Sequence, residues 1–170
     1  PNRTLFAERL DEASAHGNLA VLFVDLDRFK QINDTMGHEF GDELLQAVAS
    51  RLAGFVREPA IVARFGGDEF TVLLPKVESR DEAVGEAERL LTVIAEPYRV
   101  RGQTVSIRAS AGVATAADPP SVPLALVRDA DAALYHAKDR GRGRVEVFDQ
   151  RLLVAAEQRL EVERHLVDAL

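Results

Sequence analysis

The apolar run from Leu19 to Val24 constrains the fold more than any other part of the sequence. Successive side chains of a strand point to opposite faces, and here both faces are apolar. That pattern is typical of a central strand that is covered on both sides. The run is far too short to span a bilayer. The sequence therefore predicts a layered fold with this strand inside it.

Helices and strands are predicted on either side of this strand. Apolar residues at helical spacing predict helices over residues 3–16, 39–56 and 124–137, and a further helix begins at a capping box over residues 79–82. Apolar runs predict strands over residues 61–65, 70–74, 98–100, 103–113 and 144–148. Because a short turn joins residues 61–65 to 70–74, the sheet cannot be wholly parallel. We predict an α+β fold with a mixed, mainly antiparallel central sheet flanked by helices.

The first candidate site is Asp25-Leu26-Asp27, which ends the apolar run abruptly. A strand with two apolar faces gains nothing from a carboxylate at its end unless that end opens on a site. The alternative is a polar exit from the strand, in which Asp27 caps a helix over residues 28–33. A calcium-binding EF-hand is a poor match, because Lys30 occupies the position of the required glycine.

The second candidate is Gly66-Gly67-Asp68-Glu69, the turn between two predicted strands. Glycines tolerate a positive φ and let a ligand approach the backbone. Two adjacent acids repel each other, so this turn carries more charge than a hairpin needs; a solvated acidic turn is the alternative. If the hairpin lies beside the first strand, Asp68 comes close to Asp25. Two carboxylates on adjacent elements are the usual way to hold Mg²⁺ against nucleotide phosphates.

The third candidate is a polar, glycine-punctuated segment over residues 29–42, which leads into a predicted helix. Asn33 and Asp42 are suited to reading a base edge. A carboxylate accepts hydrogen bonds from N1–H and the amino group of guanine and is repelled by N1 of adenine. His38 is either a substrate contact or a structural histidine bonded to the neighbouring backbone.

The net charge of the chain favours some classes of ligand over others. The chain has 21 Lys and Arg against 28 Asp and Glu, a net charge of -7, which disfavours nonspecific nucleic-acid binding and fits a site for divalent cations. Lys138 and Arg142 are candidate phosphate-binding cations, or charges favoured by a helix C-terminus. The chain has no cysteine, which excludes a disulfide framework, a thiolate metal site and a cysteine nucleophile.

The start of the chain bears on where the protein is located. Residues 1–10 are polar and mixed and contain no signal peptide, so we expect a cytoplasmic domain with no membrane contact by this segment. The sequence opens on Pro1, and we expect it to be part of a longer protein.

The run Gly66-Gly67-Asp68-Glu69-Phe70 is the motif for which the GGDEF family of diguanylate cyclases is named, and the sequence resembles that family over about residues 1–148. Other motifs match in family order and spacing: Asp25-Leu26-Asp27-Arg28-Phe29-Lys30, Ile32-Asn33-Asp34, Gly37-His38, Gly41-Asp42, Arg64, Ala133-Leu134-Tyr135 and Ala137-Lys138. We therefore predict a GGDEF domain over residues 1–149 and a connector helix over residues 150–170.

The resemblance implies a fold like the palm of nucleotide cyclases, which is ferredoxin-like, and a reaction that condenses two GTP into cyclic di-GMP and pyrophosphate. It implies that Mg²⁺ (or Mn²⁺) is held by Asp25, Asp68 and the backbone carbonyl of Leu26. It implies that substrate is bound by Asn33, Asp42, His38, Lys30, Lys138 and Arg142, and that Asp68, Glu69 and Lys30 are catalytic. One domain binds one GTP, so a homodimer with facing sites is expected. The alternative is a non-catalytic GTP-binding domain that regulates a neighbouring domain.

Two departures from the family pattern affect these expectations. In many members an Arg-x-x-Asp site for inhibitory product precedes the hairpin. Here Arg57 is present and the aspartate is replaced by Ala60, so the site is degenerate. Residues 150–170 extend past the family's last strand and resemble a connector to an EAL-type phosphodiesterase domain. Sensory and EAL domains are therefore expected in the full-length chain.

Overall fold

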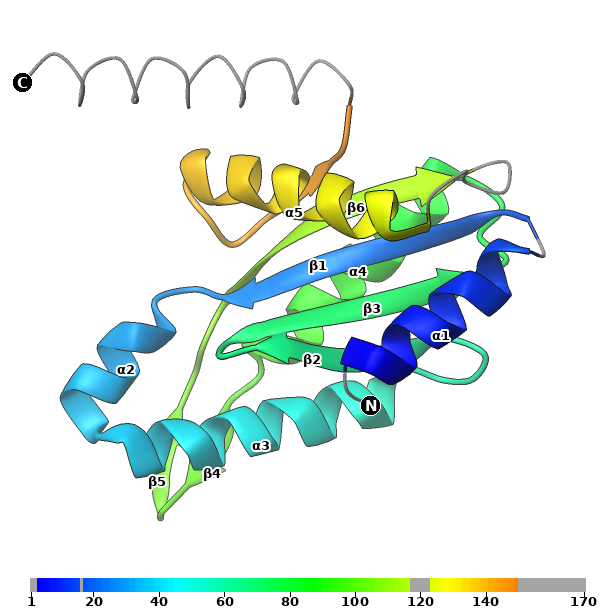
Figure 1. The fold of residues 1–170 in the computed structure, drawn as a ribbon. Helices are drawn as coiled ribbons and strands as arrows, with labels where there is room; N and C mark the ends of the chain where they lie inside the picture. The colour runs from blue at the N-terminus through cyan, green and yellow to red at the C-terminus, as the bar shows by residue number, and fades with distance from the viewer. Residues whose placement is uncertain (1–2, 16, 117–122, 150–170) are drawn as a thin grey trace, which may run out of the picture.

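A five-stranded mixed sheet lies at the centre of the protein (Figure 1), whose computed structural model describes residues 3–15, 17–116 and 123–149. The strands are β1 (Leu19–Leu26), β2 (Ile61–Gly66), β3 (Glu69–Pro75), β6 (Ala109–Ala116) and β7 (Val145–Val147). Their order is β2-β3-β1-β6-β7, and only the β6–β7 pair is parallel among them. The predicted α+β class and the mixed, mainly antiparallel sheet are confirmed.

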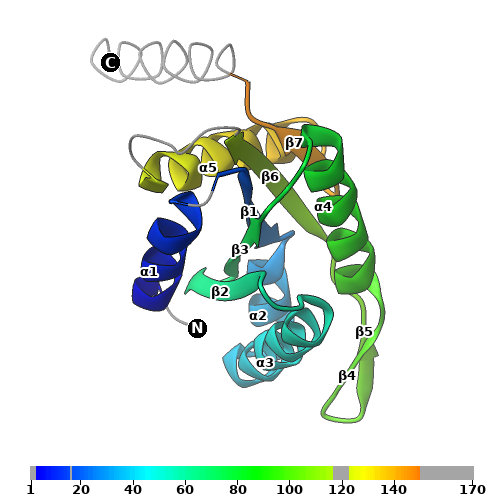
Figure 2. The same ribbon diagram turned by 90° about the vertical axis from the view of Figure 1, so that its right-hand side faces the viewer.

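Helices cover both faces of the sheet, which Figure 2 shows along the layers. Helices α1 (Arg3–Ser14) and α5 (Pro123–Asp139) lie on one face, and α3 (His38–Phe55) and α4 (Arg80–Ala95) lie on the other. The β1 residues alternate accordingly: Leu19, Val21 and Phe23 pack with α1 and α5, whereas Ala20, Leu22 and Val24 pack with α3 and α4. All eight residues of β1 are buried, so the predicted two-sided covering of this strand is confirmed.

Helix α5 lies close against β6 at Gly112. A Cβ added there would collide with the backbone of Ala130 and Leu134, so only glycine permits this approach. The helix also contacts β1. This close packing brings the last turn of α5, which carries Lys138, to the end of β1 where Asp25 lies.

Two elements differ from the sequence-based prediction. Helix α2 (Phe29–Met36) forms within the polar segment 29–42, where a helix over residues 28–33 is expected only under the alternative interpretation of Asp27. Its only buried residue is Phe29, so no apolar stripe predicts it. The predicted strand over 103–113 is two strands: β5 (Gln103–Val105) pairs with β4 (Tyr98–Val100) as a separate hairpin, and β6 starts at Ala109. Arg101 at the tip of that hairpin pairs with Glu39 and Glu43 of α3, at 2.9 and 2.7 Å, and ties the hairpin to this helix.

The capping box predicted at the start of α4 is present in a variant form. The Ser79 hydroxyl accepts a hydrogen bond from the backbone N–H of Glu82 at 3.1 Å, and the Glu82 carboxylate accepts one from the N–H of Glu78 at 2.7 Å. The helix predicted over 150–170 lies outside the described residues. Within the described ranges, no helix is both long and apolar enough to cross a bilayer.

Candidate active site

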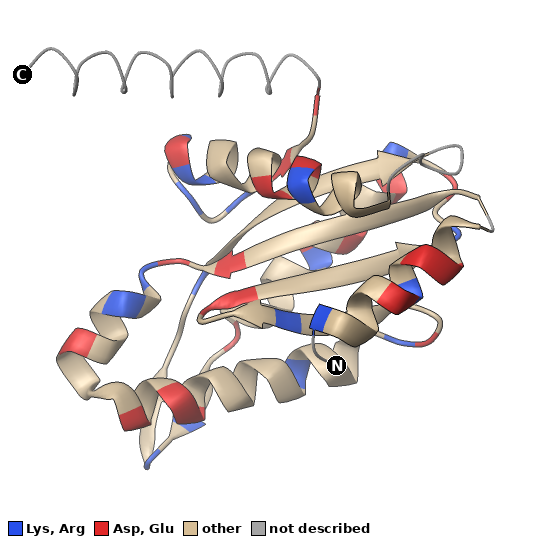
Figure 3. Ribbon diagram, viewed as in Figure 1, with Lys and Arg blue, Asp and Glu red and all other residues tan. Residues whose placement is uncertain are grey.

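The strand pairing brings the acids of two motifs together at one end of the sheet. Asp25 of β1 lies opposite Glu69 of β3, and the backbone N–H of Leu26 donates to the carbonyl of Asp68 at 3.2 Å. Figure 3 shows acidic residues side by side where β1 ends and β3 begins. Asp25 is only 8% exposed, although it lies at a strand end. The structure therefore places the carboxylates of Asp25, Asp68 and Glu69 on one small surface.

Lys138 is the cation that faces this acidic group. Its Nζ lies 2.7 Å from Oδ2 of Asp25. Burial raises the pKa of the Asp25 carboxyl, the hydrogen bond and charge of Lys138 oppose that rise, and the Asp68 charge adds to it. Burial, followed by the charge of Asp25, also raises the pKa of Glu69. Burial is the main cause of both raised pKa values, and the charges of the neighbouring acids add to it.

The turn between β2 and β3 is tighter than predicted. Gly66 pairs with Glu69, so only Gly67 and Asp68 form the loop, and a register shift between Arg64 and Gly66 marks an irregularity in the strand before it. Neither glycine has a positive φ, so the turn does not use the left-handed conformation that glycine permits. A Cβ at Gly67 would meet no atom within 4 Å. The glycine therefore leaves open space above the turn, beside Asp68.

Arg64 fixes the tip of this hairpin. Its Nε and Nη2 both donate to the carbonyl oxygen of Gly67, at 3.0 and 2.7 Å. A guanidinium that bonds one carbonyl twice holds that peptide unit in a defined orientation. The sequence motif contained Arg64, but its contact was not predictable, because it depends on the bulge in β2.

Asp27 does not cap α2, and that reading of the motif is wrong. The residue before α2 is Arg28, in the left-handed region at φ 59°, with no side-chain capping bond. The Asp27 carboxylate instead accepts hydrogen bonds from the Ser110 hydroxyl at 2.8 Å and from the Gly143 N–H at 3.0 Å. Asp27 therefore joins the end of β1 to β6 and to the turn after α5.

Asn33 and Asp42 are brought together by the hairpin of α2 and α3. A Cβ at Gly41 would collide with Oδ1 of Asn33, so the asparagine side chain lies directly against the residue before Asp42. Oδ1 of Asn33 is buried and has no hydrogen-bond partner within the part of the chain that the structure describes. Asp42 is exposed, and His38, the first residue of α3, is exposed as well. These two residues present one acceptor without a partner among the described residues and one exposed carboxylate.

The candidate phosphate-binding cations lie on different elements. Lys30 is exposed on the first turn of α2. Arg142 follows α5 in a Schellman motif, in which the Arg142 N–H donates to the carbonyl of Ala137 at 3.0 Å and Gly141 has a φ of 110°. Arg142 itself has a φ of 64°, which is uncommon for a residue other than glycine. This turn places Arg142 near Lys138 at the same end of the sheet.

Asp131 is an exposed acid close enough to influence the site, and the motif reading missed it. It lies two helical turns before Lys138 on α5, and its charge raises the pKa of Glu69. The spacing of seven residues, which puts Asp131 and Lys138 on one helix face, is the signal that could have found it.

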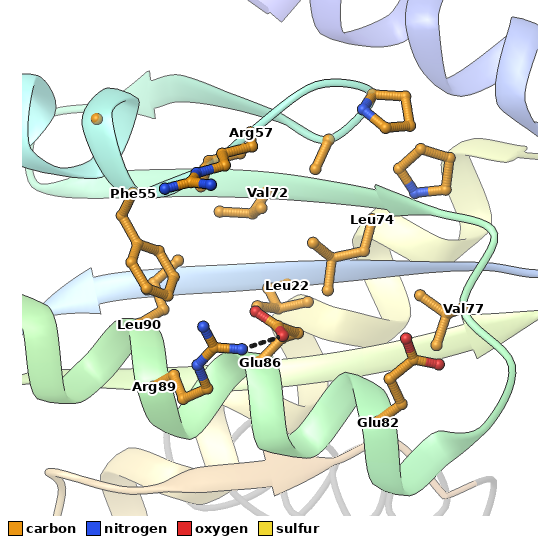
Figure 4. A pocket seen from close by; sticks show the side chains of 15 residues that line it. Leu22, Phe55, Arg57, Val72, Leu74, Val77, Glu82, Glu86, Arg89 and Leu90 are labelled. Carbon is orange, nitrogen blue, oxygen red and sulfur yellow. Dashed lines mark hydrogen bonds and ion pairs between the residues drawn. The ribbon is translucent and has the colours of Figure 1, made fainter.

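Arg57 and Ala60 line a separate pocket of about 500 Å³ between the end of α3, the β2–β3 pair and α4 (Figure 4). Glu82, Glu86 and Arg89 of α4 lie on its opposite wall. Arg89 is paired with Glu86 at 2.6 Å. The pocket is at the place where the resemblance locates a product site, and it contains no aspartate at position 60.

Comparison with known proteins decides the family. A family model described as "Diguanylate cyclase, GGDEF domain" matches residues 1–144. The chain belongs to the GGDEF family. The GGDEF domain is 43% identical over 162 residues to the diguanylate cyclase TpbB of Pseudomonas aeruginosa, an alignment that covers 90% of this chain and 37% of TpbB. It is 40% identical over 175 residues to the bifunctional diguanylate cyclase/cyclic di-GMP phosphodiesterase MucR of the same species, an alignment that covers 100% of this chain and 25% of MucR.

Solved structures agree with the fold of the GGDEF domain. The crystal structure of the TpbB GGDEF domain superposes with a TM-score of 0.82 at 41% identity, covering 88% of this chain and 96% of that one. The GGDEF domain of DgcB from Caulobacter crescentus, in complex with c-di-GMP, superposes with a TM-score of 0.78 at 31% identity, covering 86% and 87%. The chain spans less than half the length of the curated relatives TpbB and MucR.

The residues at the end of β1 suit a divalent cation, which the family's reaction generally uses. Mg²⁺ is usually held by one or two carboxylates together with substrate phosphates and water, and it rarely has a complete protein cage. Asp25 and Asp68 supply two carboxylates, and the charge of Asp68 contributes to raising the pKa of the largely buried Asp25 carboxyl. No cluster of three acidic or histidine side chains that could hold a metal ion occurs in the described ranges. The GGDEF domain therefore fits a cation shared with a phosphorylated substrate.

Proposed function

We propose that this GGDEF domain is a diguanylate cyclase that converts two GTP into one cyclic di-GMP and two pyrophosphates. Each 3′-oxygen attacks the α-phosphorus of the other GTP, forming one phosphodiester bond and releasing one pyrophosphate, and each 3′-hydroxyl loses its proton. The observation that carries this proposal is the convergence of Asp25, Asp68, Glu69 and Lys138 at one end of the sheet. The named activity of TpbB at 43% identity supports it.

The proposed metal site consists of Asp25, Asp68 and the backbone carbonyl of Leu26, with Mg²⁺ (or Mn²⁺) as the ion. When bound, the ion supplies charge that offsets the triphosphate and lowers the pKa of an attacking hydroxyl. Asp25 is held rigidly, because it is buried and paired in the sheet on both sides, with Glu69 and with Ser110. Asp68 and Glu69 are proposed to accept the hydroxyl proton, and the raised pKa of the Glu69 carboxyl supports this role because it favours proton uptake.

The proposed guanine site lies between α2 and α3. The unsatisfied Oδ1 of Asn33 and the Asp42 carboxylate are both acceptors, which match the N1–H and amino donors of guanine. His38 starts α3 beside them and is proposed as a further substrate contact. Burying a base edge here would satisfy the Asn33 acceptor, whose unpaired burial costs free energy in the unliganded domain.

The triphosphate is proposed to contact Lys30, Lys138 and Arg142. The ion pair of Lys138 with Asp25 supports its contact, and the positions of Lys30 at the start of α2 and of Arg142 in the turn after α5 support the other two. Lys30 is proposed to be catalytic as well, because a cation beside the reacting phosphate stabilises charge that develops in the transition state. The protein thus supplies position and charge on three sides of the nucleotide.

Because one domain has one such site, the active unit is proposed to be a homodimer in which two GTP molecules face each other. The rate of cyclic di-GMP formation per chain should therefore rise with protein concentration. At low concentration the total rate should increase more steeply than linearly. The measurement is the rate of cyclic di-GMP formation from GTP and Mg²⁺ over a wide range of protein concentration, with the mass of the protein followed by light scattering. A rate strictly proportional to concentration in a monomeric chain would contradict the two-domain reaction.

The same assay separates the second candidate function, a GTP-binding domain without turnover that regulates a neighbour. GTP binding with no cyclic di-GMP at any concentration would select it.

We propose that the full-length protein has sensory and EAL domains joined to this one, with residues 150–170 as the connector; the bifunctional activity named for MucR supports a phosphodiesterase neighbour. We also propose a cytoplasmic location, because GTP is available there.

Product inhibition at the Arg57 pocket is expected to be weak. Arg57 can still contact a phosphate, but the Ala60 side chain cannot accept a hydrogen bond from guanine. Loss of a hydrogen bond to a charged group costs about 1.5–3 kcal/mol, or about 10- to 100-fold in affinity. Calorimetric titration of cyclic di-GMP, with the active site filled by nonhydrolysable GTP, measures this.

The variant Ala60→Asp should tighten cyclic di-GMP binding by that factor, and adding Arg57→Ala to it should remove the gain. Submicromolar binding to the unaltered domain that Arg57→Ala abolishes would show that the product site is intact and that the interpretation of Ala60 is wrong.

A further inference from the structure

Three arginines converge on a groove beside the proposed active site. The groove has a volume of about 650 Å³ and lies between α2, the chain from β5 to β6, and the turn after α5. It is lined by Arg28, which directly precedes α2, by Arg108 between β5 and β6, and by Arg142 in the turn after α5. Thr35 and Ser106 add hydroxyl donors to the lining. Of these five residues, only Arg142 belongs to the nucleotide site proposed above.

The three arginine segments are joined by hydrogen bonds around Asp27. Its N–H donates to the carbonyl of Arg108 at 2.8 Å, and its carboxylate accepts from Ser110 and from the Gly143 N–H. A Cβ added at Gly143 would be in ordinary van der Waals contact with the Arg108 Cδ, at 3.8 Å, so these two segments lie side by side. The groove is thus a built feature whose walls are fixed to one another, and its width does not depend on a single loop.

The charge of the groove is positive and unpaired. Arg28, Arg108 and Arg142 form no ion pair with any of the residues that the structure describes, whereas Arg9, Arg89, Arg101, Arg128 and Arg140 all pair with acids. Asp27 is the one carboxylate among the lining residues, and both of its oxygens already accept hydrogen bonds. In a chain with a net charge of -7, a groove with three free guanidinium groups attracts and concentrates anions.

We propose that this groove binds a diphosphate group. A guanidinium forms paired hydrogen bonds with phosphate oxygens, and three of them around one groove match a ligand with several adjacent anionic oxygens better than a single carboxylate. The identity of the ligand rests on the proposed function: it is the pyrophosphate that the reaction releases, or the terminal phosphates of a nucleotide. Arg142 belongs to both sites, so a leaving pyrophosphate can stay bound to Arg142 while it gains Arg28 and Arg108.

The test is calorimetric titration of pyrophosphate into the whole chain in metal-free buffer, where binding bridged by a cation is absent. Arg108→Gln should weaken pyrophosphate binding by about 10-fold, and Arg28→Gln together with Arg108→Gln by about 100-fold, as expected for charge-assisted hydrogen bonds. Arg99→Gln is the matched control: Arg99 is exposed on β4, does not line the groove, and its removal changes the net charge by the same amount.

A parallel titration with GDP distinguishes the source of the diphosphate. If Arg108→Gln weakens the binding of pyrophosphate and of GDP equally, the groove recognises the diphosphate itself. If it weakens the binding of GDP alone, the groove recognises a diphosphate carried by a nucleotide. If Arg108→Gln changes pyrophosphate and GDP binding no more than Arg99→Gln does, the groove is not a diphosphate site. These titrations measure binding and do not depend on turnover. If the separate activity assay shows no cyclic di-GMP but pyrophosphate binds through Arg108, the proposed function is wrong and the groove assignment stands.

Discussion

Replacing Asp68 by alanine should reduce cyclic di-GMP synthesis by at least ~10²-fold, because the change removes a carboxylate that stabilises charge at the metal-centred reaction. Folding should be little affected. Asp68 is one of only two residues in the β2–β3 turn, and its contact with β1 is made by its backbone carbonyl, which alanine keeps. The steady-state rate with GTP and Mg²⁺, and the thermal unfolding midpoint, are the two measurements.

Asp68 is a cleaner target than Asp25 for this test. Asp25 is buried and bonded to Lys138, so its removal would leave a partly buried lysine without its partner and would lower stability as well as activity. Asp11→Ala, at an exposed position of α1 far from the motif, is the control for loss of one carboxylate. Turnover of Asp68→Ala close to that of the unaltered domain would remove Asp68 from the site.

GTP should bind in preference to ATP by a factor that approaches ~10⁴, through Asn33 and Asp42. Sites that hydrogen-bond a substrate group reject an analogue that lacks it by factors of this size, because the polar groups of the site are left unpaired. Adenine presents an acceptor at N1, where guanine presents a donor, and it would face the Asp42 carboxylate and the unsatisfied Oδ1 of Asn33. Calorimetric titration of each nucleotide with Mg²⁺ checks the ratio.

A variant comparison isolates the carboxylate in this selectivity. Asp42→Asn should weaken GTP binding more than ATP binding and so reduce the preference, whereas Asp11→Asn, with the same loss of charge on α1, should change neither affinity. Comparable affinities of the unaltered domain for GTP and ATP would contradict the assignment of the guanine readers.

Sequence periodicity predicted the elements that have an apolar stripe or run, and it failed where packing alone forms the element. The two-sided burial of β1 and the helices α3, α4 and α5 follow their apolar patterns. Helix α2 buries only Phe29, so its sequence resembles a loop. The strands β5 and β6 read as one run because the residues between them are also partly apolar, and only their different pairing partners separate them.

In the candidate site, too, some residues were predictable from the sequence and others were not. Asp25 and Asp68 could be selected because acids at the end of an apolar strand and in a tight turn have little structural reason to be there. Asp27 has the same sequence context as Asp25, yet its carboxylate bonds to Ser110 and Gly143, which are remote in the sequence. No local pattern distinguishes the two acids.

By itself the sequence determined that this protein has a covered central strand ending in acids, an acidic glycine turn, and the motifs of the GGDEF family. Only the tertiary structure decided that β3 and β6 are the strands beside β1, that Lys138 faces Asp25 at 2.7 Å, and that three arginines share one groove. The physical reason is that periodicity records which side of an element is buried, a local property of a few turns or residues. The partner across an interface depends on the packing of all the layers together, such as the close approach of α5 to Gly112.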